Sequence, residues 1–493
     1  MESTDLLVVG AGPAGMSAAV AARRCGMRVL VIDENSEPGG QIYRSVLSNA
    51  PRTQRNRMLG ADYLAGQALA RSFLDSGADW RPRSTVFEVA DDGSASIVTP
   101  GLGAYAVRAE AVLIATGAYE RPFPVTGWTL PGVMTAGAAQ TLLKASGQVP
   151  DGRIVLAGGG PLLWYAASQL RAAGADVAAI LSFTPLSGYA RQLPALLAAW
   201  RFAGDLLSGA KWMAGLQLGA TRVVHGARVT RIEGDAPGLQ VHYEVAGRRG
   251  VEQAATVLVH AGVCPNVQVS KSLRLAHDWD EAQQCWRPRL DAWGASSSNS
   301  IMIAGDGAGI SGAKDAVRGG ALAALAVAAR LGLISAERRD AEAAPLLAAR
   351  QRERRLRAFL DALYAPPDWL RVPEDDATVV CRCEEITAAQ VRTAVRRGAA
   401  GPNQVKDYVR AGMGACQGRM CAQTVAAIVA GERGLSAQDV PTQHVRPPLK
   451  PMHLADLAAM DIGVSASEGR SLTESLLHAP VHDTSAQDAT KLH

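Results

Sequence analysis

Residues 6–33 read LLVVG, AGPAGMSAAVAARRCG and MRVLVID: an apolar strand, a glycine-rich turn that opens a helix, and a second apolar strand. This order predicts a dinucleotide-binding βαβ unit. Its first glycine makes the tight turn, its second lets the backbone approach a pyrophosphate, and its third permits close contact between helix and strand. Asp33, at the end of the second strand, is expected to accept hydrogen bonds from ribose hydroxyls. The loop residues predicted to bind the dinucleotide are Gly10, Gly12, Pro13, Ala14 and Gly15.

The same pattern occurs a second time. A unit starting at Arg153 reads RIVLAGGG, then the helical LLWYAASQLRAAGA and the strand-like DVAAIL. Two further buried strands, within 111–117 and 256–266, each run into a glycine turn. Repeated βαβ openings predict an α/β fold of two Rossmann-like nucleotide-binding domains with parallel sheets covered by helices, followed by a small helical four-cysteine domain.

The order of these patterns predicts the domain boundaries. A nucleotide-binding domain is interrupted by a second one, and composition then changes to a charged helix and a proline-containing linker. The arginine run at 350–357 is read as a solvated helix face. The predicted segments are 1–119 and 263–335 for the first domain, 120–262 for the second, 336–373 for the helix and linker, 374–440 for the cysteine domain, and 441–493 for an extension and a disordered tail.

Two further segments favour FAD over NAD in the first domain. The motif GGQ at 39–41 follows the second strand, as in flavoproteins whose dinucleotide lies extended along the sheet. The strand IMIAGD at 301–306 ends on an aspartate that can hydrogen-bond the ribityl chain. With ATG at 115–117, residues 1–335 resemble the two-dinucleotide-binding flavoproteins that include glutathione and thioredoxin reductases. The additional flavin-binding candidates are Gly40, Gln41, Thr116, Gly117, Gly305 and Asp306.

The second glycine loop departs from that family. Leu163 stands where a third small residue is expected, and an alignment on the glycines before each strand places Leu181 opposite Asp33, so the ribose-binding acid is missing. We therefore expect this NAD(P)H site to be degenerate. Residues 1–335 also lack a redox disulfide motif, and Cys264, without a partner cysteine nearby in the sequence, is read as a small buried residue.

Four cysteines near the C-terminus predict a metal centre. Two close pairs separated by 32 residues suit a four-thiolate site, and neighbouring glycines let the backbone wrap around it. Zinc and an iron–sulfur cluster both remain open on spacing alone. The flavin-binding sequence at the other end of the chain favours a [2Fe–2S] cluster. The predicted ligands are Cys381, Cys383, Cys416 and Cys421.

Composition excludes some classes of protein. A net charge of +4 over 493 residues is too small to indicate nucleic-acid binding. The longest apolar stretch, 321–334, is too short to span a bilayer, and no targeting signal is visible. A soluble cytoplasmic protein is expected, with attachment to the inner face of the membrane through partners left open.

A closer resemblance covers about 1–455. The chain is similar to the α subunits of hydrogen cyanide synthase, opine oxidase and D-hydroxyproline dehydrogenase, and its cysteine module resembles a bacterioferritin-associated-ferredoxin-like [2Fe–2S] domain. The motifs that carry the resemblance are GGQIYR (39–44), AGGGPLLW (157–164), GVCPN (262–266), AGDGAGISGA (304–313), VCRCEEIT (380–387), GACQGRMC (414–421) and RPPLKP (446–451).

The resemblance implies one subunit of a heteromeric amino-acid or opine dehydrogenase. A glycine-oxidase-like β subunit would oxidise the amine, and this chain would relay electrons through FAD and the cluster to an acceptor such as a quinone or carrier protein. An FMN at a subunit interface and a small γ subunit remain open. No catalytic residue is predicted in this chain. The alternatives are a stand-alone NAD(P)H-dependent reductase and a zinc-containing assembly or regulatory subunit.

Overall fold

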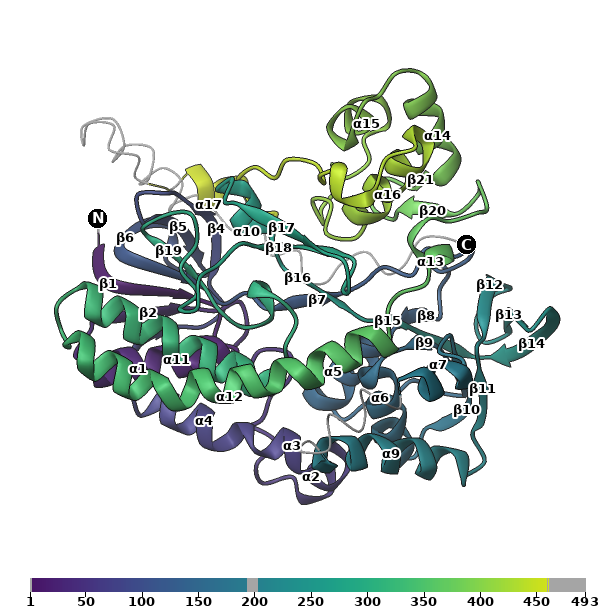
Figure 1. Cartoon of the computed structure of the whole chain (residues 1–493), viewed down its shortest axis with the longest axis horizontal. Coiled ribbons are helices and arrows are strands. Elements are labelled where there is room, and N and C mark those ends of the chain that lie inside the picture. The colour runs from purple at the N-terminus through teal and green to yellow at the C-terminus, as the bar shows by residue number, and fades with distance from the viewer. Residues whose placement is uncertain (1, 193–202, 459, 461–493) are drawn as a thin grey trace, which may run out of the picture.

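The computed structural model describes residues 2–192, 203–458 and 460 (Figure 1). The predicted tail beyond 460 lies outside these residues. Two sheet-containing domains lie side by side, and a small helical domain sits above their junction. The predicted fold class, α/β with two nucleotide-binding-type domains and a small helical cysteine domain, is confirmed. Within the described part of the chain, no helix is long and apolar enough to cross a membrane.

The first domain is built on a seven-stranded sheet. Strands β3, β2, β1, β6 and β19 run parallel, and β5 and β4 continue the sheet antiparallel. The middle strands are buried on both faces, which explains their continuous apolar sequence. The strands are β1 (Glu2–Val9), β2 (Val29–Ile32), β3 (Asp79–Arg81), β4 (Thr85–Val89), β5 (Ser94–Thr99), β6 (Gly103–Ile114) and β19 (Ile301–Ile303).

Helices cover this sheet. Helices α1 and α11 approach closely, since a Cβ added at Gly320 would lie 2.0 Å from the carbonyl oxygen of Ala14. Glycine therefore allows the two backbones to touch. The helical elements of this domain are α1 (Pro13–Arg24), α2 (Thr53–Leu59), α3 (Ala61–Leu64), α4 (Gly66–Leu74), α10 (Gln268–Ser272), the 3₁₀ helix η2 (Gly305–Ala308) and α11 (Ala313–Arg330).

The second domain has a parallel five-stranded sheet in the order β11-β10-β9-β15-β8 and a separate antiparallel sheet of β12, β13 and β14. Its bounds are β8 (Val133–Thr135), α5 (Ala136–Ala145), β9 (Arg153–Gly159), α6 (Pro161–Ala172), β10 (Asp176–Ser182), α7 (Leu186–Arg191), α9 (Ala203–Gln217), β11 (Arg222–His225), β12 (Arg228–Glu233), β13 (Leu239–Val245), β14 (Arg248–Ala254) and β15 (Thr256–Ala261).

Two short ladders lie between the domains. The chain passes from the first domain to the second through β7 (Ala118–Glu120) and returns through β16 (Val263–Pro265), and these two strands pair antiparallel. Beside them, β17 (His277–Asp280) pairs with β18 (Cys285–Pro288). In Figure 1 these strands run below the small helical domain.

The long helix α12 (Ala336–Leu363) packs along α11. Arg350, within the arginine run, makes two hydrogen bonds to the buried carboxylate of Asp315, at 2.9 and 3.2 Å. Arg357 likewise pairs with the buried Asp361. The interpretation of this run as a solvated face is therefore wrong for these two arginines, because each neutralises a carboxylate that folding buries.

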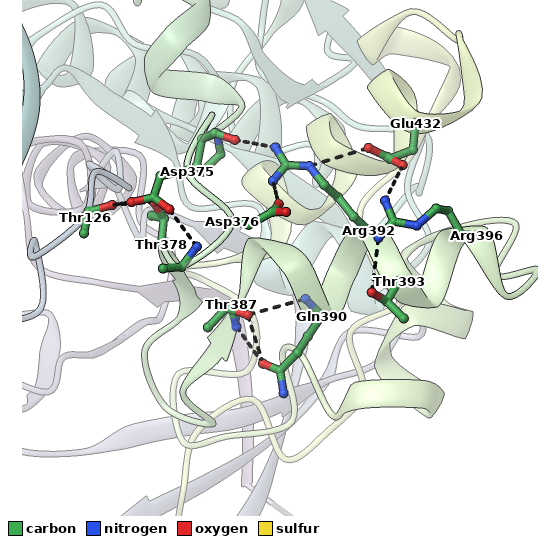
Figure 2. Close-up of polar contacts among 12 residues, drawn as sticks. Thr126, Asp375, Asp376, Thr378, Thr387, Gln390, Arg392, Thr393, Arg396 and Glu432 are labelled. Atoms are coloured by element: carbon green, nitrogen blue, oxygen red, sulfur yellow. Dashed lines mark hydrogen bonds and ion pairs between the residues drawn. The ribbon is translucent and has the colours of Figure 1, made fainter.

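The small domain has its own apolar core. It is anchored to the second domain where Thr126 donates to Asp375 (Figure 2). Nearby, the Trp128 indole donates to the carbonyl of Val379 at 2.7 Å. Within it, Arg392 bonds Asp376 and Glu432. Its elements and the flanking helices are α13 (Asp368–Arg371), β20 (Val379–Cys381), β21 (Ile386–Thr387), α14 (Ala388–Arg396), α15 (Pro402–Val409), α16 (Ala422–Arg433), η3 (Ala437–Asp439) and α17 (Leu454–Ala458).

Candidate flavin and iron–sulfur sites

The first glycine loop joins β1 to α1. A Cβ at Gly10 would lie 2.6 Å from the Ala115 carbonyl oxygen, and one at Gly15 would lie 1.8 Å from the Gly10 carbonyl oxygen. The protein's own backbone thus requires both glycines. At Gly12 the nearest atom to an added Cβ is 3.9 Å away, on Gly40. The space beside Gly12, at the N-terminus of α1, is open, as a bound pyrophosphate requires.

Asp33 holds this loop together from the end of β2. One carboxylate oxygen accepts a hydrogen bond from the Ala11 amide at 2.6 Å, and the other accepts from the backbone and side chain of Asn35. Its proposed bond to ribose stays a prediction. The next residue, Glu34, is half-exposed and pairs with Lys450 at 3.0 Å. Glu34 is a second candidate for the ribose, which the sequence reasoning missed.

The motif at 39–41 lies on the glycine loop. The Gly39 amide donates to the Ala11 carbonyl at 2.8 Å, and a Cβ at Gly40 would lie 2.9 Å from the Gly12 Cα. Gly40 also has a φ of +59°, which favours glycine. The Gln41 side chain accepts a hydrogen bond from Arg44. The structure thus brings together the loop residues and the second motif predicted to bind FAD.

The other flavin candidates meet at the carboxyl ends of β6 and β19. Asp306 accepts hydrogen bonds from the amides of Ser311 and Gly312 at 3.0 and 2.9 Å, directly before α11. The Gly117 carbonyl accepts from the Asn266 amide at 2.9 Å. The Thr116 hydroxyl is buried and has no hydrogen-bond partner among the described residues. An unpartnered buried hydroxyl at this edge fits a bound ligand that supplies the missing bond.

A buried lysine joins the two domains. The Lys144 ammonium, on α5, donates to the carbonyl of Gln41 at 3.1 Å and to the side chain of Gln140 at 3.0 Å. Burial, assisted by the positive charge of Arg44, lowers the pKa of Lys144 to about 7. A lone lysine on an amphipathic helix gives no sequence signal of such an environment.

The second glycine loop, between β9 and α6, has aromatic side chains beside it. A Cβ at Gly159 would lie 2.5 Å from the Phe183 ring, and one at Gly160 would lie 3.5 Å from the His260 ring. His260 is itself held by Glu120 at 2.7 Å. Leu163 is completely buried. The Phe183 ring thus lies beside the position equivalent to Ala11, whereas at Gly160, the equivalent of Gly12, an added Cβ would make only an ordinary van der Waals contact. The expected degeneracy of this site stays a prediction.

Strand pairing corrects one detail of the sequence alignment. Val9 pairs with Ile32 in the first sheet, and Ala157 pairs with Leu181 in the second. Leu181 therefore corresponds to Ile32, and Ser182 occupies the position of Asp33. The alignment was wrong by one residue because the pairing of β10 with β9 contains a register shift between Val177 and Ala179. The position still lacks a carboxylate.

The four predicted cysteine ligands come together from two loops. Their thiols approach one another in two pairs, Cys381 with Cys421 and Cys383 with Cys416. The hydrogen bond from Cys421, together with backbone amides, lowers the pKa of Cys381 to about 6 against the opposing effect of burial. A lowered pKa favours the thiolate at Cys381, the form that binds metal, whereas the same hydrogen bond raises the pKa of its partner Cys421.

Glycines line this cysteine site. A Cβ at Gly414 would lie 2.2 Å from the Cβ of Cys383, and the Gly412 amide lies 3.5 Å from the Cys381 sulfur. As the side chains are placed, no group of three or more His, Cys, Asp or Glu in the described residues could hold a single metal ion. The donor set of four thiols in two pairs fits the two-iron cluster, which takes four cysteine ligands.

Cys264 has a neighbour that the sequence did not reveal. Cys285, on β18, hydrogen-bonds it, and both side chains are fully buried. Cys264 is buried, as predicted, but it has a partner cysteine that the sequence reading did not find. The Cys264 sulfur lies 3.4 Å from the Gln423 side-chain oxygen, which also accepts from Arg121 at 2.9 Å. These residues form a junction between the first domain and the helix that follows Cys421.

Comparison with known proteins agrees with this geometry. The family model "Pyridine nucleotide-disulphide oxidoreductase" matches residues 4–328. The chain belongs to this family. Residues 379–431 match the "BFD-like [2Fe-2S] binding domain" model. The chain is therefore a flavin oxidoreductase with a [2Fe–2S]-binding domain, and its resemblance to the family of opine oxidase and hydrogen cyanide synthase is confirmed.

The relatives are similar over most of the chain. An opine oxidase subunit from Agrobacterium tumefaciens (strain Ach5) is 45% identical, covering 92% of this chain and 91% of the relative. The HcnB subunit of hydrogen cyanide synthase from Pseudomonas aeruginosa is 34% identical, covering 84% and 90%. The crystal structure of L-proline dehydrogenase from P. horikoshii superposes with a TM-score of 0.67 at 17% identity, covering 92% of this chain and 79% of that chain, which shows a shared fold.

Proposed function

We propose that this chain relays electrons within a heteromeric flavin-dependent dehydrogenase of amino acids or opines. A glycine-oxidase-like β subunit oxidises the secondary amine. This chain passes the electrons through FAD and a [2Fe–2S] cluster to a quinone or carrier protein. The relatives from opine oxidase and hydrogen cyanide synthase support this assignment, since each is named as one subunit of its enzyme.

The junction between the two cofactor regions carries the proposal. Gln423 is two residues from the proposed ligand Cys421 and accepts a hydrogen bond from Arg121, which follows β7. Arg121 also donates to the backbone carbonyls of Gln283 and Gln284, so three segments are fixed at one buried side chain. This junction holds the cysteine domain against the β7–β16 ladder, which continues directly from the flavin candidates Thr116 and Gly117. Electron transfer between the flavin and the cluster requires that the distance between these two cofactors be fixed.

In the proposed assignment the chain's residues bind and hold the cofactors. The loop at 10–15 receives the pyrophosphate of FAD, whose isoalloxazine ring supplies the redox chemistry when bound. Asp33 fixes the loop, Gly305 and Asp306 face the ribityl end, and the four cysteines ligate the cluster. An FMN at the interface with the β subunit belongs to the same proposal, as does a small γ subunit.

The test uses the chain with and without its β subunit. Mixed alone with a candidate amine in a stopped-flow instrument, the chain should keep its flavin oxidised for many seconds. Once the β subunit is present, the same amine should reduce a dye. Cys416→Ser should retain FAD, lose iron and sulfide, and abolish dye reduction, because a hydroxyl does not replace a thiolate ligand. Cys25→Ser, a buried cysteine at the end of α1, is the matched control.

Two results would contradict the proposal. Flavin reduction by an amine within seconds in the chain alone would place amine oxidation here. Stoichiometric zinc without sulfide in the wild type would instead support an assembly or regulatory role.

A further inference from the structure

We propose that Gln443 donates a hydrogen bond to the [2Fe–2S] cluster and raises its reduction potential. This inference rests on the proposed function, because it requires the cluster. Gln443 lies outside the matched cluster domain, which ends at residue 431. It belongs to the extension that follows η3, so the fold of the cysteine domain alone would not contain it.

The Gln443 side chain lies against the cysteine loop. Its amide nitrogen is 2.3 Å from the position of a Cβ added at Gly412 and 1.8 Å from one added at Gly418. Both glycines have positive φ, +90° and +82°. The Gly412 amide is the one that faces the Cys381 sulfur at 3.5 Å. The side-chain amide of Gln443 therefore fills the space that these two glycines leave beside the proposed ligands.

This amide lacks an acceptor. Gln443 is 5% exposed, and its side-chain nitrogen has no hydrogen-bond partner within the described residues. A buried donor left unpaired destabilises the fold, because it has lost its hydrogen bonds to water without gaining another partner. A cluster sulfur, in the form of a sulfide or a cysteine thiolate, is the acceptor that the missing group would supply at this position.

The neighbours of Gln443 hold it in place. On one side, the Thr442 hydroxyl accepts a hydrogen bond from the Lys271 ammonium of α10. On the other side, the His444 amide donates to the Asn403 side chain of α15 at 2.9 Å. The segment is thus pinned to the first domain and to the cysteine domain at once. The hydrogen-bond donor is therefore held in position by the protein before the cluster binds. Donors placed in this way, next to the ligands of a metal centre, change its reduction potential.

The direction of the effect follows from charge. Reduction adds an electron to the cluster, and a hydrogen-bond donor stabilises the more negative state. Removing the donor should therefore lower the midpoint potential. We expect roughly a tenfold change in the reduction equilibrium, which corresponds to about 59 mV for one electron.

The experiment is a redox titration of the purified full-length chain, followed by the visible and electron paramagnetic resonance signals of the cluster. Gln443→Leu removes the donor, and Gln443→Glu replaces it with a carboxylate of similar size. Both should keep iron and sulfide content and lower the midpoint potential, with the larger shift in Gln443→Glu. Gln404→Leu, at an exposed glutamine of α15, is the control and should leave the potential unchanged.

Three outcomes count against the inference. An unchanged potential in both Gln443 variants overturns it, as does an equal fall in Gln404→Leu. If Gln443→Leu loses the cluster, Gln443→Glu carries the measurement. Loss of the cluster in both variants would mean that Gln443 only supports the cysteine loop, which contradicts the inference. Zinc without sulfide in the wild type would contradict the proposed function itself, before any variant is compared.

Discussion

In the first glycine loop the space beside Gly12 is open, whereas in the second the Phe183 ring lies against Gly159 and the His260 ring lies near Gly160. The turns themselves are alike. A Cβ at Gly10 would strike the Ala115 carbonyl, and a Cβ at Gly158 would strike the His260 carbonyl in the same way. The first glycine of each loop is therefore required by the backbone of the turn itself. Binding depends on the side chains that surround the turn.

The ends of the neighbouring strands extend this contrast. Asp33 and Ser182 occupy equivalent positions, and each accepts a hydrogen bond from the amide two residues later, at 2.7 and 3.3 Å. The second domain therefore has the same hydrogen bond to the backbone amide, but Ser182 carries no negative charge where Asp33 has a carboxylate. The predicted degeneracy of the second site would leave this fold intact, because a Rossmann-like fold does not depend on the groups that recognise the dinucleotide.

The largest expected effect comes from Gly12→Val. Because nothing lies closer than 3.9 Å to an added Cβ, the apo-protein should remain folded. The valine side chain should clash with the pyrophosphate and weaken the binding free energy of FAD by about 3 kcal/mol, which is a loss of about 100-fold in affinity. Titration of apo-protein with FAD, followed by flavin fluorescence, measures this. Gly431→Val, on α16 with no atom within 4 Å, is the control, and wild-type FAD occupancy in Gly12→Val would show that the site lies elsewhere.

A smaller effect should follow from opening the second loop. In the wild type, neither NADH nor NADPH should bleach the flavin within seconds. The double variant Ser182→Asp/Phe183→Ala restores a carboxylate and removes the ring beside Gly159. A charged hydrogen bond is worth about 2 kcal/mol, so NADH affinity should rise more than tenfold. Calorimetric titration with NADH tests this, with Phe183→Ala alone as the control. Rapid flavin reduction in the wild type would refute the assignment of a degenerate site.

The smallest effect concerns Lys144, which ties the second domain to the loop carrying Gln41. Its pKa of about 7 in the folded chain lies below its ordinary value of 10.5. Between these values the unfolded chain binds more protons, so the free energy of unfolding should rise with pH above 7, by about 1.4 kcal/mol per pH unit at most. Urea unfolding at pH 7, 8 and 9 measures this slope.

Lys144→Met should flatten the slope, because it removes the titrating group. Lys211→Met, at an exposed position of α9, should leave it as in the wild type. An unchanged slope in Lys144→Met would mean that other groups set the pH dependence of the stability.

Much of the fold was predictable from local patterns. The strand, glycine turn and helix at 6–33 depend on neighbouring residues alone, and the structure places β1, α1 and β2 there. The short spacings predicted that Cys381 and Cys383 share one loop and that Cys416 and Cys421 share another. The pairing of the thiols runs across the two loops, Cys381 with Cys421 and Cys383 with Cys416, and depends on the tertiary structure. The error at Leu181 arose because a register shift adds a residue that periodicity does not reveal.

The sequence by itself determined the fold of the two nucleotide-binding-type domains and the four-cysteine module. It also predicted a degenerate second dinucleotide site, which stays a prediction. Only the tertiary structure brought Cys264 to Cys285, Arg121 to Gln423 and Gln443 to the cysteine loop. Each of these contacts joins residues that are far apart in the chain, and no local propensity encodes such a meeting. It is decided when separate elements bury their apolar faces against one another and the polar side chains between them must find partners.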